Sequence, residues 1–357
     1  MSDPITISID AMGGDHGPPV VVEGVAIAAK RLAGRNLRFL LHGDGDLIEA
    51  ALAANPAVRA LVETRHTDLK IASDEKPAVA LRRGKGSSLW NAIEAIRDGE
   101  AQAVVSAGNT GALMAMSKLI LRMAVGLDRP AIVASWPTMR GVTAVLDVGA
   151  NVASDAEQLV EFAIMGEAFY RAVHGGGDPD CRPTVGLLNV GSEDVKGHEE
   201  VREAGRLLRE AGIDLDYRGF VEGDDIAKGT VDVVVTDGFT GNIALKTAEG
   251  MARFFSTALR ESLTSTVWAK LGALIAMAAL DRMRARFDPS GVNGGPLLGL
   301  NGVVVKSHGG ADAKGFANAI KVAADLAASD YAAHSARNME RLSAALRETP
   351  TAAEKAQ

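Results

Sequence analysis

The chain has 357 residues, 39 of them glycine, with 47% hydrophobic and 4% aromatic residues and a formal net charge of −7. This composition is typical of a soluble α/β protein, and the negative charge argues against a general nucleic-acid binder. The single cysteine, Cys181, excludes an internal disulfide and a cysteine-rich zinc site. The sequence shows no signal peptide and no apolar run of about 18 residues, so it predicts a cytoplasmic protein.

Predicted strands and helices alternate from the start of the chain. The alternating run 5–9 precedes a glycine turn at 10–17, and apolar residues then recur with helical spacing over 18–32. Further strands are predicted at 37–42, 61–65, 103–106, 131–135 and 141–147. Further helices are predicted at 46–54, 77–83 and 89–97, after the turn 106–112, and from Ser154 or Asp155 onward. This alternation is typical of a mainly parallel sheet covered by helices.

The glycine- and proline-rich loop 174–183 separates this block from a second one and predicts a subdomain junction. The second block has predicted strands at 184–190, 231–236 and 303–306, and predicted helices at 198–211, from Ile243 and at 313–333. We therefore expect one α/β catalytic domain at 1–336, with a protruding apolar helical segment at about 263–287 and a charged tail at 337–357.

Six predicted strands end in turns that carry glycine or small polar residues. Such turns present main-chain N–H groups at a helix N-terminus, where an anion such as phosphate binds. Because the carboxyl ends of parallel strands share an edge, we expect the turns to line one crevice. They lie at 10–17, 106–112, 147–151, 189–197, 237–242 and 306–312. A purely structural use of the glycines and asparagines, which tolerate left-handed backbone, is the alternative.

Several familiar site motifs are missing from the sequence. It has no G-x-G-x-x-G dinucleotide fingerprint, no nucleotide P-loop, no G-x-S-x-G elbow and no H-E-x-x-H zinc helix. The histidines are scattered, and only His16 and His308 fall in the predicted turns. We therefore expect no cofactor and no metal.

Taken together, the turn motifs resemble those of the bacterial phosphate acyltransferases, which transfer a fatty acyl group from acyl-acyl-carrier-protein to inorganic phosphate for membrane phospholipid synthesis. The matching stretches are DAMGGD at 10–15, SAGNTGA at 106–112, LDVGAN at 146–151, GLLNVGSE at 186–193, DGFTGN at 237–242, PLLG at 296–299 and KSHG at 306–309. The sequence departs from the usual pattern at Asn293-Gly-Gly-Pro296, where Gly-Gly-Ala-Pro is common, and at Gly310. These departures put only the local loop shape in doubt.

This resemblance implies a three-layer α/β/α sandwich similar to the fold of phosphotransacetylases and isocitrate dehydrogenases. It also implies a homodimer, with acyl-acyl-carrier-protein and phosphate as substrates. It further implies peripheral association with the inner membrane, at the lipid surface itself or through a membrane-bound downstream acyltransferase.

Acyl transfer to phosphate needs a dianion held beside a thioester carbonyl. Phosphate is already largely dianionic at neutral pH, so positioning and electrostatics should dominate over general base catalysis. The residues predicted for catalysis are Lys306, His308, Asp237 and Asn242. Those predicted to bind phosphate or substrate are Gly13, Gly14, Ser106, Asn109, Thr110, Asn151, Asn189 and Thr240. The aspartates Asp10, Asp147 and Asp237 are expected to brace loops rather than transfer protons.

Two basic patches are candidate docks for an acidic carrier protein, or simply solvated surface. They are Arg82-Arg83-Lys85 and Arg282-Arg284-Arg286. The apolar run 271–280, close to Trp268, is too short to span a bilayer. It predicts either a helix at the membrane interface or one buried in the core or at a dimer contact.

Three other functions remain open at this stage. A phosphotransacetylase would use an acyl-coenzyme A donor, which a comparison of donors distinguishes. A dehydrogenase of the isocitrate type is disfavoured by the missing nucleotide fingerprint. A non-catalytic acyl- or anion-binding scaffold would bind without turnover.

Overall fold

The computed structural model describes residues 4–178, 180–286 and 288–348, and no side chains at 284–286, 289 and 345–348. Its strands form one eleven-stranded sheet in the order β3-β2-β1-β4-β11-β10-β5-β6-β9-β7-β8. They are β1 (Ile5–Asp10), β2 (Leu37–Gly43), β3 (Val62–His66), β4 (Ala103–Ser106), β5 (Ala131–Thr138), β6 (Gly141–Leu146), β7 (Thr184–Leu188), β8 (Asp216–Val221), β9 (Val233–Val235), β10 (Gly295–Leu298) and β11 (Val303–Lys306).

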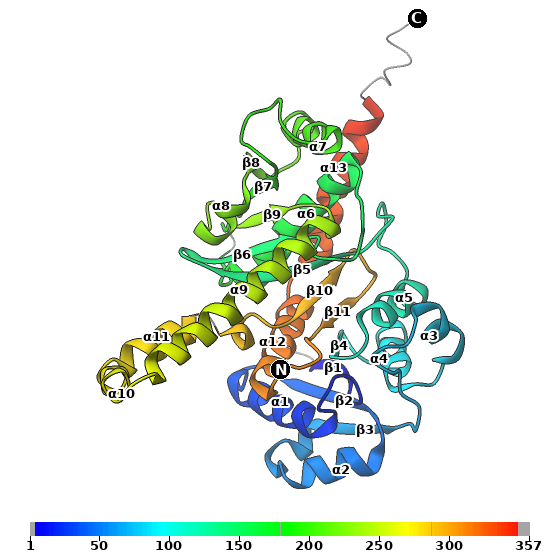
Figure 1. Cartoon of the computed structure of the whole chain (residues 1–357). Coiled ribbons are helices and arrows are strands. Elements are labelled where there is room, and N and C mark those ends of the chain that lie inside the picture. Colours follow the sequence, from blue (N-terminus) through cyan, green and yellow to red (C-terminus); the bar gives the residue numbers. More distant parts are fainter. Residues whose placement is uncertain (1–3, 179, 287, 349–357) are drawn as a thin grey trace, which may run out of the picture.

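Helices cover both faces of this sheet (Figure 1). One face is covered by α1 (Pro18–Arg31), α2 (Gly45–Ala53), α6 (Ala156–His174), α7 (Glu199–Glu210), α12 (Ala313–Ala328) and α13 (Tyr331–Glu348). The other is covered by α3 (Pro77–Arg83), α4 (Ser88–Arg97), α5 (Thr110–Leu121), α8 (Gly223–Lys228) and the start of α9 (Gly238–Thr264). Alternate strand residues supply the two cores, with Val105 in one and Val104 in the other. The predicted three-layer α/β/α sandwich is confirmed.

The strands of the two halves of the sheet run in opposite directions. β2, β3, β4 and β11 are parallel to β1, or to a strand that is. β10 is antiparallel to both β11 and β5, so β5 also runs in the direction of β1. β6 is antiparallel to β5 and therefore runs in the opposite direction. β9 and β7 then run parallel to β6. The carboxyl ends of β1, β4 and β11 therefore lie at one edge, which we call the first edge. Those of β6, β9 and β7 lie at the opposite one, the second edge.

This reversal contradicts the prediction of a single crevice lined by six turns. The turns 10–17, 106–112 and 306–312 lie at the first edge, and the turns 147–151, 189–197 and 237–242 lie at the second. The physical reason is the two-residue connection between β5 and β6, which is long enough for a hairpin but too short for the crossover that a parallel pair needs.

Several predicted boundaries also change. Helix α9 already begins at Gly238, so the predicted turn 237–242 forms its first turn. Helix α12 ends at Ala328 rather than at 333. Helix α13 continues to Glu348 and buries Met339, so residues 337–348 belong to the folded domain rather than to a tail. Residues 349–357 of the predicted tail lie outside the described residues.

A helical arm projects from the body of the molecule (Figure 1). It comprises α9, α10 (Val267–Ile275) and α11 (Met277–Arg286). Helix α9 has 27 residues, which gives it a length of about 40 Å, and only Gly238 and Gly241 are buried in it. Helix α10 has no buried residue, so the interpretation of 271–280 as a core helix is wrong. No described helix is both long and apolar enough to cross a membrane.

Candidate functional site

At the first edge, the carboxylate of Asp10 joins two of the glycine turns. Ser106 Oγ donates a hydrogen bond of 2.8 Å to Asp10 Oδ2 and accepts one of 3.0 Å from the N–H of Gly108. The N–H of Met12 donates to Asp10 Oδ1. Burial raises the pKa of Asp10, and the hydrogen bonds from the Ser106 hydroxyl and the Met12 N–H oppose that rise. Asp10 is thus a brace between the turns that follow β1 and β4.

The glycines of the first edge let main chain pack against main chain. A Cβ atom on Gly13 would lie 2.6 Å from the Gly108 nitrogen, and one on Gly14 would lie 2.9 Å from the Gly309 carbonyl oxygen. The N–H groups of Gly13 and Gly14 donate to no group among the described residues. Because α1, α5 and α12 also begin here, unpaired N–H groups and helix N-termini converge at this edge.

Lys306 supplies a cation at the same edge. Its ammonium group donates to the Ala107 carbonyl oxygen at 3.2 Å and to the Ser307 carbonyl oxygen. Burial lowers the pKa of Lys306 to about 8, while the nearby carboxylates of Asp10 and Asp15 oppose that fall. The side chain is therefore mostly charged at neutral pH.

His308 is held by Asn293, a residue whose role sequence reasoning missed. Asn293 Oδ1 accepts the His308 N–H at 2.9 Å, and its Nδ2 donates to Ser307 Oγ and the Gly315 carbonyl oxygen, both at 2.8 Å. The N–H of Gly310 donates to His308 Nδ1 at 3.1 Å, so the neutral imidazole carries its proton on Nε2. The only sequence signal at Asn293 was the departure from the usual loop pattern.

Two other predicted residues stand at the start of α5. Asn109 caps the helix by accepting the Ala112 N–H at 2.9 Å, and its Nδ2 donates to the carbonyl oxygens of Ala72, Ser73 and Glu75. Its side chain is thus used to hold a neighbouring loop. Thr110 is exposed in the first turn of the helix, where its N–H and hydroxyl remain free of partners among the described residues.

The predicted residues at the second edge mostly brace their own loops. Asp147 accepts hydrogen bonds from the N–H groups of Ile132, Gly149, Ala150 and Asn151, and from Asn151 Nδ2. Burial raises the pKa of Asp147, and the hydrogen bonds from Ala150, Ile132 and Asn151 oppose the rise. The fully satisfied carboxylate matches the bracing role expected for it.

Helix α9 begins directly on this brace. Asp237 caps the helix, accepting the Thr240 N–H at 2.9 Å and its hydroxyl at 2.7 Å. Asn189 Nδ2 donates to the Lys196 carbonyl oxygen at 3.1 Å and so closes the loop 189–197. Asn242 is exposed and forms no hydrogen bond with a described residue. Of the predicted residues at this edge, it alone keeps its side-chain polar groups entirely free.

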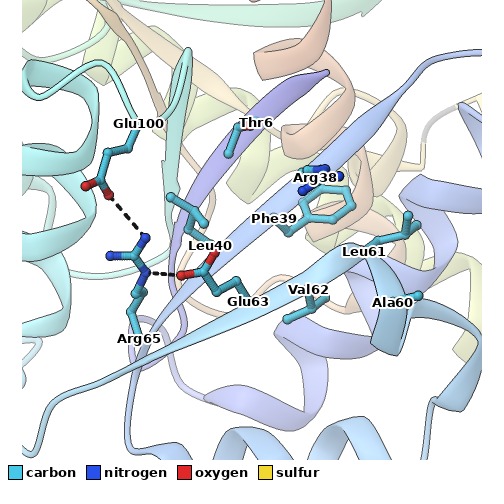
Figure 2. Close-up of a pocket in the computed structure, with 10 residues that line it drawn as sticks. All are labelled: Thr6, Arg38, Phe39, Leu40, Ala60, Leu61, Val62, Glu63, Arg65 and Glu100. Atoms are coloured by element: carbon cyan, nitrogen blue, oxygen red, sulfur yellow. Dashed lines mark ion pairs between the residues drawn. The ribbon is translucent and has the colours of Figure 1, made fainter. Parts of the chain in front are cut away.

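Two cavities lie away from the first edge. One of about 250 Å³ is lined by residues of β1, β2 and β3, and Figure 2 shows Arg65 paired with Glu63 and Glu100 beside it. Arg38 also lines this cavity, so two arginines and two carboxylates face it. The other, of about 650 Å³, lies at the second edge between Arg129, Asn151 and the start of α6, where Asp155 and Glu200 also line it.

Comparison with known proteins covers nearly the whole chain. The family model described as "Fatty acid synthesis protein" matches residues 5–334. The phosphate acyltransferase of Caulobacter vibrioides is 69% identical over 344 residues, covering 96% of this chain and 94% of the relative. The phosphate acyltransferase of Phenylobacterium zucineum is 61% identical, and 97% of each chain is covered.

Among solved structures, the chain is similar in fold to two phosphotransacetylases. That of Streptococcus pyogenes has a TM-score of 0.60 at 18% identity, and EutD of Staphylococcus aureus has 0.58 at 16% identity. Each comparison covers 91% of this chain and 94% of the other. The predicted likeness to the phosphotransacetylase fold is confirmed.

Proposed function

The chain belongs to the phosphate acyltransferase family, whose enzymes transfer acyl groups to phosphate, and we propose that its donor is an acyl carrier protein and its reaction site the first edge of the sheet. The observation that supports this site is the convergence of Lys306 with the unpaired N–H groups of Gly13 and Gly14. A phosphate dianion needs these groups, and the helix N-termini add to the positive potential.

In the proposed reaction, main-chain N–H groups at Gly13, Gly14 and Thr110 hold the phosphate. Lys306 neutralises part of its charge, and His308 Nε2–H donates to the carbonyl oxygen as negative charge develops there. A phosphate oxygen bonds to the carbonyl carbon, the carbon–sulfur bond breaks, and the leaving sulfur takes the proton that the phosphate carried. Ser106 and Asn109 hold the turns in place.

We give the second edge a supporting part in this scheme. Asp237, Thr240, Asn151 and Asn189 brace the loops there, since their side chains are engaged locally. Asn242 is the side chain at that edge that stays free for a ligand.

The test is formation of acyl phosphate from acyl-acyl-carrier-protein and phosphate, compared with acyl-coenzyme A as donor. We expect the carrier protein to be the better donor and Lys306→Ala to lose at least a hundredfold in kcat/KM. Lys30→Ala, on an exposed lysine at the end of α1, is the control. Near-normal turnover by Lys306→Ala with unchanged phosphate dependence would remove the first edge from the mechanism. Loss only in Asn242→Ala would move the reaction to the second edge.

We further propose that the helical arm serves a homodimer and a peripheral contact with the inner membrane or with a membrane-bound downstream acyltransferase. Its many exposed apolar side chains support this, because large exposed apolar patches mark protein or membrane contacts. They include Met251, Phe254, Phe255, Trp268, Leu271, Leu274 and Ile275. Of the basic patch beside it, Arg282 is exposed, and the side chains of Arg284 and Arg286 lie outside the described residues.

Sedimentation and vesicle flotation separate these two uses of the arm. Leu274→Glu with Ile275→Glu should abolish flotation if the tip of the arm enters the lipid interface, with the dimer intact. If the same pair yields monomers, the tip is a protein contact. Leu47→Glu with Val125→Glu, on two exposed apolar side chains of the body, controls for the two added charges.

A further inference from the structure

Five cations gather on the segment between β3 and α4, and none of them forms an ion pair with a described residue. They are Lys70, Lys76, Arg82, Arg83 and Lys85, and all five are exposed. The segment also carries Asp68, which faces His66, together with Asp74 and Glu75. In a chain of net charge −7 this surplus of free positive charge is local.

The two ends of the segment lie side by side. The N–H of Ser88 donates to the Leu69 carbonyl oxygen at 2.9 Å, and the Thr67 hydroxyl donates to the Gly86 carbonyl oxygen at 2.7 Å. Lys70 and Lys85 are therefore neighbours although fifteen positions separate them.

Apolar side chains are exposed among these cations. Leu69 is 54% exposed, and Val79 on α3 is 36% exposed. Arg82 and Arg83 follow Val79 by three and four positions, so they share its face of the helix. We call Leu69, Val79 and the five cations the basic surface. Positive charge around an apolar centre is the composition of a protein docking site.

The basic surface is tied to the first edge by several contacts. The three hydrogen bonds from Asn109 Nδ2 fix residues 72–75 to the start of α5. The N–H of Thr67 donates to the Gly43 carbonyl oxygen, at the end of β2, and Pro77 lies against Gly111. Figure 1 shows α3 beside α4 and α5, on the same side of the molecule. A molecule docked on this surface lies next to the first edge, where the N–H groups of Gly13, Gly14 and Thr110 are proposed to hold phosphate.

We propose that the basic surface is the dock of the acidic acyl carrier protein, an inference that rests on the donor proposed above. Charge complementarity favours this occupant, because an acidic protein is repelled by the rest of a chain with net charge −7. The docked carrier delivers its acyl thioester over the start of α5, where Thr110 is exposed. Asn109 is a positioning residue, because its hydrogen bonds fix the basic surface relative to the start of α5.

The test compares two double charge reversals of equal size. Arg82→Glu with Arg83→Glu alters the basic surface. Lys30→Glu with Arg31→Glu alters two exposed cations at the far end of α1 that form no ion pair with a described residue. Binding of the carrier protein is measured by fluorescence anisotropy at low and high ionic strength. KM is measured for acyl-acyl-carrier-protein, for phosphate and for an acyl-pantetheine donor without the protein.

We expect the first variant to weaken carrier binding and raise the carrier KM about tenfold at low ionic strength, with the difference shrinking as salt is added. KM for phosphate and for acyl-pantetheine should not change, which a misfolded enzyme would not reproduce. The α1 variant should bind and turn over the carrier as the wild type does. Lys70→Glu with Lys85→Glu is the second variant, and it should behave like the first.

Three results would overturn this assignment. If carrier binding weakens equally in the basic-surface variant and in the α1 variant, the net charge of the enzyme explains the loss and the basic surface is not the dock. Unchanged carrier binding with lost flotation on anionic vesicles would make the surface a membrane contact. A wild-type enzyme that neither binds nor uses the carrier protein, but uses acyl-coenzyme A, would refute the donor proposal and the dock together. Refutation of the dock alone requires carrier turnover that survives both reversals.

Discussion

The pH dependence of Lys306 provides the sharpest test of the candidate site. Burial lowers its pKa to about 8, so the charged fraction falls tenfold for each pH unit above that value. Phosphate becomes a dianion above its second pKa of about 6. If Lys306 acts as a cation on that dianion, kcat/KM for phosphate should be bell-shaped, with limbs near pH 6 and pH 8.

Stability should move in the opposite direction over the alkaline range. An unfolded lysine titrates near 10.5, so between about 8 and 10.5 the unfolded chain binds a proton that the folded chain has lost. The free energy of unfolding therefore rises with pH across that window. Below pH 8 both states are protonated, and the full cost of burying the charge, about 3 kcal/mol, opposes folding.

Two substitutions of Lys306 separate these effects. Lys306→Arg keeps its charge at high pH, so the residual activity should lack the alkaline limb. Lys306→Met should be inactive, and its free energy of unfolding should no longer rise between about pH 8 and 10.5, because no buried ammonium group is left to lose its proton. Rates from single-turnover assays and urea denaturation across pH 6–10 measure both. An alkaline limb that persists in Lys306→Arg, or an unchanged stability slope in Lys306→Met, would refute the reasoning.

Three further outcomes are expected. Asp10→Asn removes an acceptor shared by two glycine turns, so KM for phosphate should rise severalfold while KM for the acyl donor stays constant. A rise only in KM for the acyl donor would contradict this. Gly241→Ala pushes a Cβ into the Asp147 carbonyl oxygen and should cost at least about 2 kcal/mol by urea denaturation, whereas Gly250→Ala, in open space on α9, should add about 0.5–1 kcal/mol. Glu161→Gln should be more stable than the wild type above pH 7 and equal to it below about 4.5, because burial and three neighbouring carboxylates raise the pKa of Glu161 to about 7; equal stability at both pH values would contradict it.

Local pattern predicted most elements well and their directions poorly. The strand 103–106 and the helix 77–83 have the predicted bounds, because apolar periodicity and turn residues act over a few positions. Strand β10 was missed because it begins with Gly295 and Pro296, which are turn residues rather than strand residues, and β8 was missed as well. The β5–β6 hairpin was overlooked, and nothing in the turn motifs themselves signalled that the sheet reverses direction there.

The same limit applies to the polar residues at the turn tips. Asn109 and Asp237 each cap a helix, which is a local use of a short polar side chain that sequence could have suggested from their positions before α5 and α9. The role of Asn293 could not be predicted, because the partners of its side chain lie up to 22 positions away and are brought together only by the fold. A polar tip is therefore a sound guide to where a helix starts and a weak guide to which group meets substrate.

The reversal of the sheet also gives the helical arm two different attachments. The arm leaves the body at Gly238, on the second edge, and the chain re-enters at Gly295, on the first. Just before that re-entry, Asn293 binds the His308 N–H and the first turn of α12. One end of the arm is thus anchored on the Asp147 brace and the other on the loop that holds His308. The Asn293 hydrogen bonds thus join the re-entry of the arm to the loop that carries His308, and the N–H of Asp15, which donates to the Gly309 carbonyl oxygen, joins that same loop to the glycine turn after β1.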